Sequence, residues 1–385
     1  MFKKYYNLLI IIISFLIIFS LLSCSEDEPA PSFDVKISVI DSSGIFSKIQ
    51  NGNTGVPKAK VILKSLETGR EFIAYTDSSG IAKLLDIQSG SYDILIERIV
   101  SPEEMYKATG NNTESLLTGQ LTKIFFNPAN TIKTIGVNFS KIGTLIFSEI
   151  YYNGAPAPPT SYFHDQYTEI YNNTDSVLYV DGIILANVYK DYITDNHYIH
   201  SSIVWQFPGS GKEYPIYPGG FIIVAQDAID HRLSHPKSID LRSADFEYYN
   251  ERTDGKDLDN PDVKNMIRIK MNTQFDWNYG VGSDAIIMAK VPDVNALQYD
   301  SQGNLLIPIS SVIDGVEWIA DLNMSKKKLH PSIDVSATGG IPMYSGKSIE
   351  RKIIRMVGSR AVLSDMNNSL VDFDTLSAPT YRKLH

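Results

Sequence analysis

The sequence of 385 residues contains one cysteine, Cys24, and this scarcity limits how the fold can be held together. A single cysteine cannot form an intrachain disulfide, so the stability of the fold must come from buried apolar side chains. The composition supplies them, since 43% of the residues are hydrophobic and 21% are charged. These values argue against a disordered chain, and the length is sufficient for two domains, each with its own core.

Basic residues are also in short supply. The chain has 35 lysines and arginines against 44 aspartates and glutamates, which gives a formal charge of −9 at pH 7. No basic stripe stands out along the sequence. Because contacts between basic side chains and phosphates supply most of the affinity for nucleic acids, this composition indicates a protein that does not bind nucleic acid.

The signatures of several enzyme classes are missing as well. The sequence has no G-x-S-x-G nucleophile motif, no H-E-x-x-H zinc motif and no lysine-bearing kinase signature. The segment Pro208–Lys212 resembles part of a phosphate-binding loop, but Glu213 follows the lysine where that loop needs serine or threonine. We therefore expect a protein that is not an enzyme.

The first residues have the features of a lipoprotein signal peptide. Lys3 and Lys4 precede the 15-residue apolar run Leu8–Leu22, which is shorter than the roughly 20 apolar residues of a stable membrane span. The run ends in LLSC, which resembles a bacterial lipobox. We expect residues 1–23 to be cleaved and Cys24 to carry a lipid, which leaves no thiol for catalysis. Cleavage removes two lysines and leaves 33 basic against 44 acidic residues, a formal charge of −11.

The composition of residues 24–32 predicts a flexible, acidic tether that is anchored by the lipid. Three acids and then prolines follow the cysteine in SEDEPAPS, a composition that cannot pack into a core. An acidic run at this position resembles the surface-export signal of Bacteroidetes lipoproteins. This resemblance implies a protein anchored by lipid in the outer membrane and exposed on the cell surface.

Residues 33–140 predict a small β-sandwich. Apolar and polar residues alternate through Phe33–Ile40, the pattern of a half-buried strand. The pieces GVPKAKV, TDSSGI and GSYDILIE resemble the transthyretin-like domains of the carboxypeptidase regulatory type. Such domains serve as stalks and spacers, and the resemblance implies no catalysis. Within this region Ser101–Gln120 is a polar insertion of unpredicted shape.

Residues 141–385 predict a larger β-sandwich. Leu145–Tyr152 is apolar on both faces, as a central strand is, and the proline-rich Gly154–Thr160 ends it. LIFSEIYY, YTEIYNNTDSVLYVDGIIL and YPGGFIIVA resemble the lamin-tail type of immunoglobulin-like sandwich. The predicted fold class is therefore all-β, with two β-sandwich domains. The long insertions Val188–Ser202 and Asp227–Asn272 depart from the resemblance, and we expect function to lie there.

The whole chain resembles an uncharacterised family of Bacteroidetes outer-membrane lipoproteins that join a transthyretin-like domain to a lamin-tail-like domain. Members of that family often occur beside TonB-dependent outer-membrane receptors. The resemblance implies a surface-exposed, non-enzymatic binding or accessory module that assists such a receptor in ligand uptake. Two alternatives stay open: a secreted metal-dependent hydrolase or nuclease, and a passive adhesive or structural surface protein.

Aromatic side chains beside the proline-rich loop and in the first insertion form the predicted surface for a ligand or partner. Tyrosines on loops at one end of a sandwich favour recognition, because each offers a large rigid face and a polar tip. The alternative role for any of these residues is core packing. The predicted residues are Tyr152, Tyr162, Phe163, His164, Tyr189, Tyr192 and Tyr198.

Histidines in the two insertions are candidate metal ligands. His197 and His200 form one closely spaced pair, and His231 and His235 form another. Imidazoles beside carboxylates can bind zinc or another divalent cation, whereas solvated loop histidines are the alternative. The acidic stretch Asp240–Asp262 lacks the ligand spacing of a calcium loop, and we expect it to be a solvated loop.

Glu149 and Glu169 lie on adjacent predicted strands and could form the carboxylate pair of a glycosidase. Both match scaffold positions of the lamin-tail pattern. We therefore expect them to hydrogen-bond backbone groups instead.

Two short segments, DSV and DTL, resemble the O-glycosylation motif of Bacteroidetes. They make Ser176 and Thr375 candidate sites for a sugar, provided that both side chains are exposed.

Overall fold

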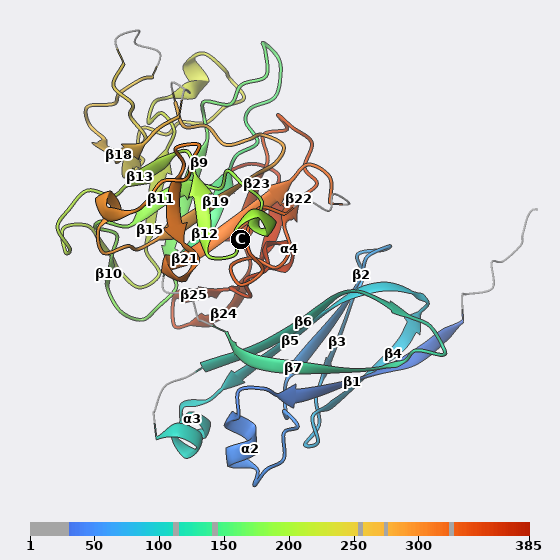
Figure 1. The fold of residues 1–385 in the computed structure, drawn as a ribbon. Coiled ribbons are helices and arrows are strands. Elements are labelled where there is room, and N and C mark those ends of the chain that lie inside the picture. The colour runs from blue at the N-terminus through green and yellow to red at the C-terminus, as the bar shows by residue number, and fades with distance from the viewer. Residues whose placement is uncertain (1–30, 111–114, 141–144, 253–256, 273–275, 323–326) are drawn as a thin grey trace, which may run out of the picture. The chain divides into compact units, whose positions relative to one another are not determined.

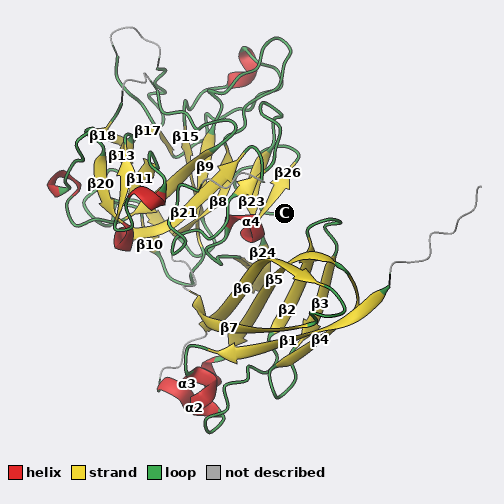
Figure 2. Ribbon diagram, turned by 45° about the vertical axis from the view of Figure 1, so that its right-hand side comes forward, coloured by secondary structure: helices red, strands yellow, loops and turns green. Residues whose placement is uncertain are grey.

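The computed structural model describes residues 31–110, 115–140, 145–252, 257–272, 276–322 and 327–385 (Figure 1). The predicted signal peptide and the lipidation site Cys24 lie outside the described residues. Contacts divide the chain into two compact units, Met1–Phe139 and Ser140–His385. Strands dominate both units, and the described residues contain three short α-helices (Figure 2). The prediction of an all-β fold is confirmed.

No helix in the described part of the chain is long and apolar enough to cross a membrane.

The first unit is built on a seven-stranded sheet with the order β3-β2-β5-β6-β7-β1-β4. Strand β1 pairs antiparallel with β4 and parallel with β7. Two short helices, α2 (Ile45–Ile49) and α3 (Pro102–Thr109), lie between strands in the sequence. The strands are β1 (Ser32–Asp41), β2 (Lys60–Ser65), β3 (Glu71–Tyr75), β4 (Ile81–Gln88), β5 (Gly90–Val100), β6 (Ser115–Phe126) and β7 (Ile132–Ser140).

The core of the first unit follows the alternation seen in the sequence. Val35, Ile37 and Val39 of β1 are fully buried, whereas the side chains between them face outward. Val61 and Leu63 of β2 are buried in the same cluster. A period of two is what a strand with one face on a core requires, so the pattern in this stretch determines the strand.

Helix α3 gives the polar insertion a regular shape. Ser101 accepts a hydrogen bond from the backbone N–H of Glu104, and the Glu104 side chain accepts one from the backbone N–H of Ser101. This reciprocal capping box, with Pro102 at the first helical position, satisfies amide groups that a helix start leaves unpaired. The helix ends at Gly110, which has a positive φ of 79°.

The second unit contains two larger sheets. One has the order β18-β13-β11-β19-β21-β22, and the other has the order β17-β16-β15-β9-β8-β23-β26. The strands of the first are β11 (Ile184–Asn187), β13 (Val204–Gln206), β18 (Ile267–Lys270), β19 (Asp284–Ala289), β21 (Val312–Ile319) and β22 (Thr338–Gly339). Those of the second are β8 (Leu145–Tyr151), β9 (Tyr167–Asn172), β15 (Phe221–Ala225), β16 (Phe246–Glu247), β17 (Lys264–Asn265), β23 (Ser348–Arg351) and β26 (Phe373–Leu376).

Shorter elements fill the connections of the second unit. Three two-stranded sheets pair β10 with β14, β12 with β20 and β24 with β25. Their bounds are β10 (Leu178–Tyr179), β14 (Pro215–Ile216), β12 (Tyr198–Ser201), β20 (Leu305–Pro308), β24 (Ile353–Val357) and β25 (Arg360–Leu363). The helical turns are η1 (Tyr192–Thr194), η2 (His231–Leu233), η3 (Val294–Ala296), η4 (Ile309–Ser311) and α4 (Ser369–Asp372).

The main core of the second unit lies between its two larger sheets. Phe147 and Ile170 from one sheet pack in the same cluster as Trp205, Met288 and Trp318 from the other. Shared burial of side chains from two sheets is the defining feature of a sandwich. The second unit is therefore a β-sandwich.

Further apolar clusters cover the outer faces of both sheets. Ile199 of β12 and Ile307 of β20 pack with Ile287 of β19 on one outside face. Tyr167 of β9 and Leu241 belong to a cluster on the other. Every residue of β8 is buried as a result, and this explains why its sequence is apolar on both faces.

Candidate functional site

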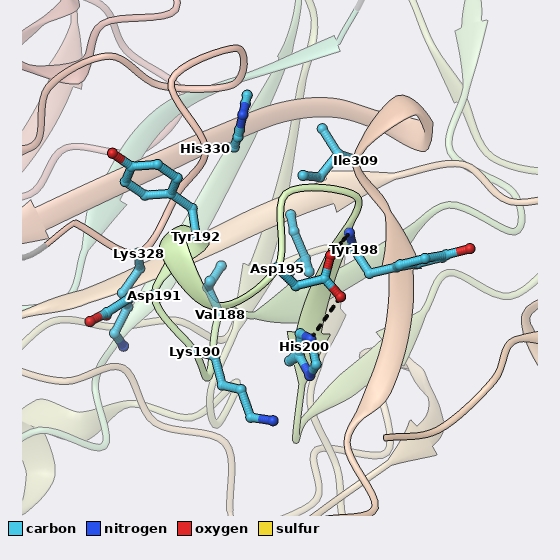
Figure 3. Close-up of a pocket in the computed structure, with 11 residues that line it drawn as sticks. Val188, Lys190, Asp191, Tyr192, Asp195, Tyr198, His200, Ile309, Lys328 and His330 are labelled. Atoms are coloured by element: carbon cyan, nitrogen blue, oxygen red, sulfur yellow. Dashed lines mark hydrogen bonds and ion pairs between the residues drawn. The ribbon is translucent and has the colours of Figure 1, made fainter. Parts of the chain in front are cut away.

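A shallow pocket lies on the first insertion of the second unit (Figure 3). It encloses about 230 Å³ of space, including the part that is open to solvent. Its walls come from the loop after β11, from β12, and from three residues later in the chain. We call it the polar pocket; it is lined by Val188, Lys190, Asp191, Tyr192, Asp195, Tyr198, Ile199, His200, Ile309, Lys328 and His330.

Asp195 fixes the turn that forms one wall of this pocket. Its Oδ1 accepts hydrogen bonds from the backbone N–H groups of His197, at 2.8 Å, and Tyr198, at 3.2 Å. Its Oδ2 lies 3.3 Å from Nε2 of His200 (Figure 3). The hydrogen bond from the His197 backbone, followed by these other contacts, holds the pKa of Asp195 below its usual range. The carboxylate therefore stays ionised and keeps the turn in place.

A second carboxylate, Asp300, lies outside the lining of the polar pocket and holds two residues that line it, Lys190 and His200. Its Oδ2 lies 2.7 Å from Nδ1 of His200 and 2.7 Å from Nζ of Lys190. Burial alone would raise the pKa of Asp300, but hydrogen bonds from Lys190, Asn304 and His200 outweigh it and lower the pKa. Both ring nitrogens of His200 are thus engaged, which fixes the orientation of the imidazole.

Aromatic rings and paired charges complete the polar pocket. The Tyr192 ring stands edge-on to the His330 ring, with centroids 5.8 Å apart, and the Tyr198 side chain is 41% exposed. Lys328 forms an ion pair with Asp284 at 2.8 Å, and Lys190 pairs with Asp300. Each lysine of the pocket is thus paired with a carboxylate that lies outside the lining.

A separate group of rings gathers where the proline-rich loop meets the second insertion. The Tyr162 ring stacks on His235, with centroids 3.9 Å apart and planes inclined by 16°. The Tyr162 hydroxyl donates to Nδ1 of His231 at 2.9 Å, and Nε2 of His231 donates to the backbone carbonyl of Asp227 at 2.9 Å. Burial lowers the pKa of His231 to about 4, so this imidazole is neutral at pH 7.

Next to these rings lies a group of His164, Asp227 and Asp276, which we call the His–Asp cluster. One potential ligand atom from each of the three side chains lies within 4.8 Å of the others. Nδ1 of His164 is 3.1 Å from Oδ2 of Asp276. Of all described residues, these three form the one group of histidine and carboxylate side chains with the proximity that a metal ion requires.

Strand pairing explains how distant residues reach the His–Asp cluster. Tyr167 at the start of β9 pairs with Ala225 at the end of β15. His164 lies just before the first of these residues and Asp227 just after the second. The third segment carries Asp276, and Gln166 holds it in place. The Gln166 side chain accepts a hydrogen bond from the Tyr279 N–H at 2.7 Å and donates one to the Tyr279 carbonyl at 3.1 Å.

The structure corrects the predicted recognition surface at Tyr152. Its side chain is 1% exposed and stacks on Trp318, with ring centroids 4.6 Å apart. The residue follows β8 into the main core, so it serves packing. Tyr162, Phe163 and His164 are half-buried.

The remaining predicted aromatic residues all lie in the first insertion. Tyr189 is 54% exposed, while Tyr192 and Tyr198 line the polar pocket. The structure therefore separates the predicted surface into two places. Tyr192 and Tyr198 line the polar pocket, whereas Tyr162, Phe163 and His164 lie beside the His–Asp cluster.

The predicted metal ligands His197, His200, His231 and His235 do not form a metal site among the described residues. His200 and His231 use both ring nitrogens in hydrogen bonds, which leaves neither nitrogen for a cation. His197 is largely exposed. The histidine that lies in a possible metal-binding group is His164, which the sequence pattern had placed on the recognition surface.

The acidic stretch Asp240–Asp262 is also more ordered than a solvated loop. Glu247 lies in β16, and Asp257 is 5% exposed. Oδ2 of Asp257 accepts from the backbone N–H of Asn250 at 3.0 Å. The expectation of a solvated loop was wrong here, because part of this stretch packs against the sheet.

Glu149 and Glu169 are buried and bonded to the scaffold, as expected. Oε1 of Glu169 accepts from the hydroxyl of Ser148 at 2.6 Å, and Oε2 accepts from the backbone N–H of Arg382. Glu149 accepts from the Thr380 backbone N–H at 3.2 Å. The segment around residues 380–382 is thus held against the sheet by carboxylates rather than by a strand partner.

Ser176 and Thr375, the candidate glycosylation sites, are both exposed. Ser176 lies in a turn and Thr375 lies on β26, at the edge of its sheet. Both meet the condition of exposure, and their modification stays a prediction.

Comparison with known proteins shows a similar fold and a family model that matches part of the chain. Residues 217–380 match the model of a family described as a protein of unknown function, DUF4876. The chain is similar to the crystal structure of a DUF4876 family protein from Bacteroides thetaiotaomicron, with 23% identity and a TM-score of 0.57. The match covers 92% of this chain and 97% of that chain. The two share a fold. Both findings fit the resemblance to an uncharacterised Bacteroidetes family.

Two other solved structures are much less alike. A candidate adhesin from Bacteroides ovatus has 11% identity, a TM-score of 0.20 and coverage of 83% of this chain and 97% of that chain. A candidate cell-adhesion protein from Bacteroides eggerthii has 9% identity, a TM-score of 0.18 and coverage of 91% and 96%. Similarity this low carries no argument about fold or function. No curated protein matches the chain.

Proposed function

We propose that this protein is a non-enzymatic binding module that is displayed on the outer membrane by a lipid on Cys24. The polar pocket is the observation that carries the proposal. Its aromatic rings and hydrogen-bonding groups are held in place by Asp195 and Asp300 before any ligand arrives. A preorganised site loses less conformational freedom on binding, which raises affinity.

The chemistry of the polar pocket favours a neutral polar ligand such as a saccharide. Tyr192 and Tyr198 line the pocket on opposite sides of Asp195 in the view of Figure 3. An aromatic ring of this kind can stack on the apolar side of a sugar ring. Asp191 and His330 supply hydrogen-bonding groups for hydroxyls.

The bonding of the buried acids supports a binding role over a hydrolytic one. A glycosidase needs two carboxyls that face a substrate across a cleft. Glu149 and Glu169 instead accept hydrogen bonds from the segment around Thr380 and Arg382. In the polar pocket, the Asp195 carboxylate already accepts a hydrogen bond from the His197 backbone N–H and contacts the His200 ring.

The lipid anchor and the receptor belong to the same proposal. The lipobox-like LLSC and the acidic tether support display on the cell surface, and the family resemblance supports work beside a TonB-dependent receptor. In this role the polar pocket binds a sugar, which then passes to the receptor. Purification of the native lipoprotein from membranes should then recover a receptor of that class; recovery of lipid alone would contradict the partnership.

Binding of neutral oligosaccharides to immobilised protein tests the ligand directly. We expect the wild type to bind a subset of an oligosaccharide array, and we expect Tyr198→Ala to lose at least about tenfold in affinity, because stacked aromatic anchors often dominate binding energy. Tyr217→Ala is the matched control, since Tyr217 is 64% exposed and lies outside the pocket. Equal binding by wild type and Tyr198→Ala, or no binding by the wild type, would overturn the proposed ligand.

A further inference from the structure

The His–Asp cluster has the composition of a cation site, and none of its residues lines the polar pocket. Its three potential ligand atoms lie within 4.8 Å of one another. Bonds from zinc or calcium to protein ligands are about 2.0 to 2.6 Å long, so donors at this separation can share one ion. The three side chains come from three different segments of the chain, and a shared ion would link them.

The two carboxylates of this cluster are buried close together. Asp227 is 3% exposed and Asp276 is 1% exposed. Among the described residues, no lysine or arginine forms an ion pair with either one; Asp276 pairs with His164. Two buried carboxylates at this separation repel each other when both are ionised. A bound cation would relieve this repulsion, because it supplies the missing opposite charge.

Buried oxygen atoms without partners give a second, independent indication. Oδ1 of Asp276, Oε1 of Gln226 and Oδ1 of Asp257 are buried and accept no hydrogen bond. All three residues are at least nine-tenths buried. Most buried acceptors in folded proteins are satisfied, so several orphan oxygens beside one acidic cluster indicate a positively charged ligand.

The surrounding groups orient the cluster in the way that supporting residues orient metal ligands. His231 donates to the backbone carbonyl of Asp227, and Tyr162 donates to His231. The Gln226 amide donates to Oδ2 of Asp276. The contact from Gln226 fixes the direction of the Asp276 side chain, and the contact from His231 holds the backbone of Asp227, before the ion binds.

We propose that His164, Asp227 and Asp276 bind a divalent cation. One imidazole among carboxylates suits Zn²⁺ or Mn²⁺ better than Mg²⁺ or Ca²⁺, which take oxygen ligands. The His164 side chain is 25% exposed, so the ion can enter from its side. The cation joins the loop before β9, the loop after β15 and the segment before β19. This site goes beyond the proposed function and does not depend on it.

The other histidine flanked by two aspartates provides a contrast. Asp300 and Asp195 bond opposite nitrogens of His200, and Asp300 also pairs with Lys190. These carboxylates flank the ring and are already satisfied, so this arrangement holds the pocket wall and binds no cation.

Metal uptake by the full-length chain tests the proposal. Protein in detergent is stripped with EDTA, dialysed and titrated with Zn²⁺, Mn²⁺ or Ca²⁺ by calorimetry, and its thermal unfolding is followed. We expect one Zn²⁺ or Mn²⁺ per chain and a rise in the unfolding midpoint. Asp276→Asn should lower affinity by more than about 100-fold, since loss of an outer contact alone costs about 10- to 100-fold.

The ligand variants distinguish loss of metal binding from loss of folding. In EDTA, Asp276→Asn should unfold at the same or a higher temperature than the wild type, because asparagine removes a buried repelling charge. His164→Gln provides a second ligand variant at a partly exposed position. His197→Ala is the control and should keep full uptake. Absence of stoichiometric Zn²⁺ and Mn²⁺ binding by the wild type, or unchanged binding by both ligand variants, would overturn the proposal.

Discussion

Nδ1 of His164 lies 3.1 Å from Oδ2 of Asp276, although 112 residues separate the two in the sequence. The contact forms because the start of β9 lies beside the end of β15 and because Gln166 bonds to Tyr279 in the segment that follows Asp276. It brings an imidazole into a buried acidic group that has unsatisfied oxygens. A bound cation accounts for all of these features together.

Tyr162→Phe tests whether the rings beside the His–Asp cluster support it. The change removes the hydroxyl that donates to His231, and His231 in turn orients Asp227. We expect the affinity for Zn²⁺ to fall by about tenfold, with little change in the stability of the metal-free protein. Calorimetric titration measures the affinity. An unchanged affinity would mean that Tyr162 does not act through Asp227.

Tyr152→Ala tests the correction that moves this residue from the surface to the core. The ring is buried against Trp318, so its removal leaves a cavity. We expect a loss of about 3 to 5 kcal/mol in the free energy of unfolding, measured by urea denaturation. Tyr198→Ala, at an exposed tyrosine, should change stability by less than about 0.5 kcal/mol. Similar effects of the two changes would contradict the distinction.

The stability of the second unit should fall as the pH rises. Burial raises the pKa of Glu149 to about 7 and that of Glu169 to about 8. The folded state therefore holds protons that the unfolded chain releases near pH 4.5. Their stabilising contribution is complete below that pH and is lost as the pH rises through 7 and 8.

Glu169→Gln isolates this effect. Glutamine is neutral at every pH, so the variant should lose less stability than the wild type between pH 5 and pH 9 in EDTA. Thermal unfolding across this range provides the measurement. If the two proteins show parallel pH profiles, Glu169 does not titrate in this range in the folded state.

Cys24→Ala tests the anchor. Without a thiol to modify, the chain should leave the membrane fraction and appear in the soluble fraction, with unchanged circular dichroism. Fractionation of cells that express each form provides the comparison. Continued attachment of the variant to membranes would contradict a lipid on Cys24.

Much of the β-structure could be predicted because its pattern is local. The alternation in Phe33–Ile40 corresponds to β1, and the apolar run Phe221–Ala225 matches β15. Helix α3 was missed, although Ser101, Pro102 and Glu104 together form a start signal that the sequence displays. Local sequence signals were thus sufficient to predict these strands, and the start signal of helix α3 was overlooked.

The site residues depend on contacts that no local pattern contains. Asp276 lies in no motif, and its role follows from the pairing of Tyr167 with Ala225 and from the bonds of Gln166 to Tyr279. Tyr152 was misplaced because an aromatic residue beside a proline-rich loop has the same sequence pattern on a surface as at the end of a core strand. Burial decides between these cases, and burial is a property of the whole fold.

Anomalous diffraction from crystals of the chain grown with Zn²⁺ tests the cation site most directly. The predicted result is one strong peak about 2.0 to 2.2 Å from a ring nitrogen of His164 and from carboxylate oxygens of Asp227 and Asp276. Zinc bound only elsewhere, for example beside His197, or no peak between these three side chains, would contradict the site.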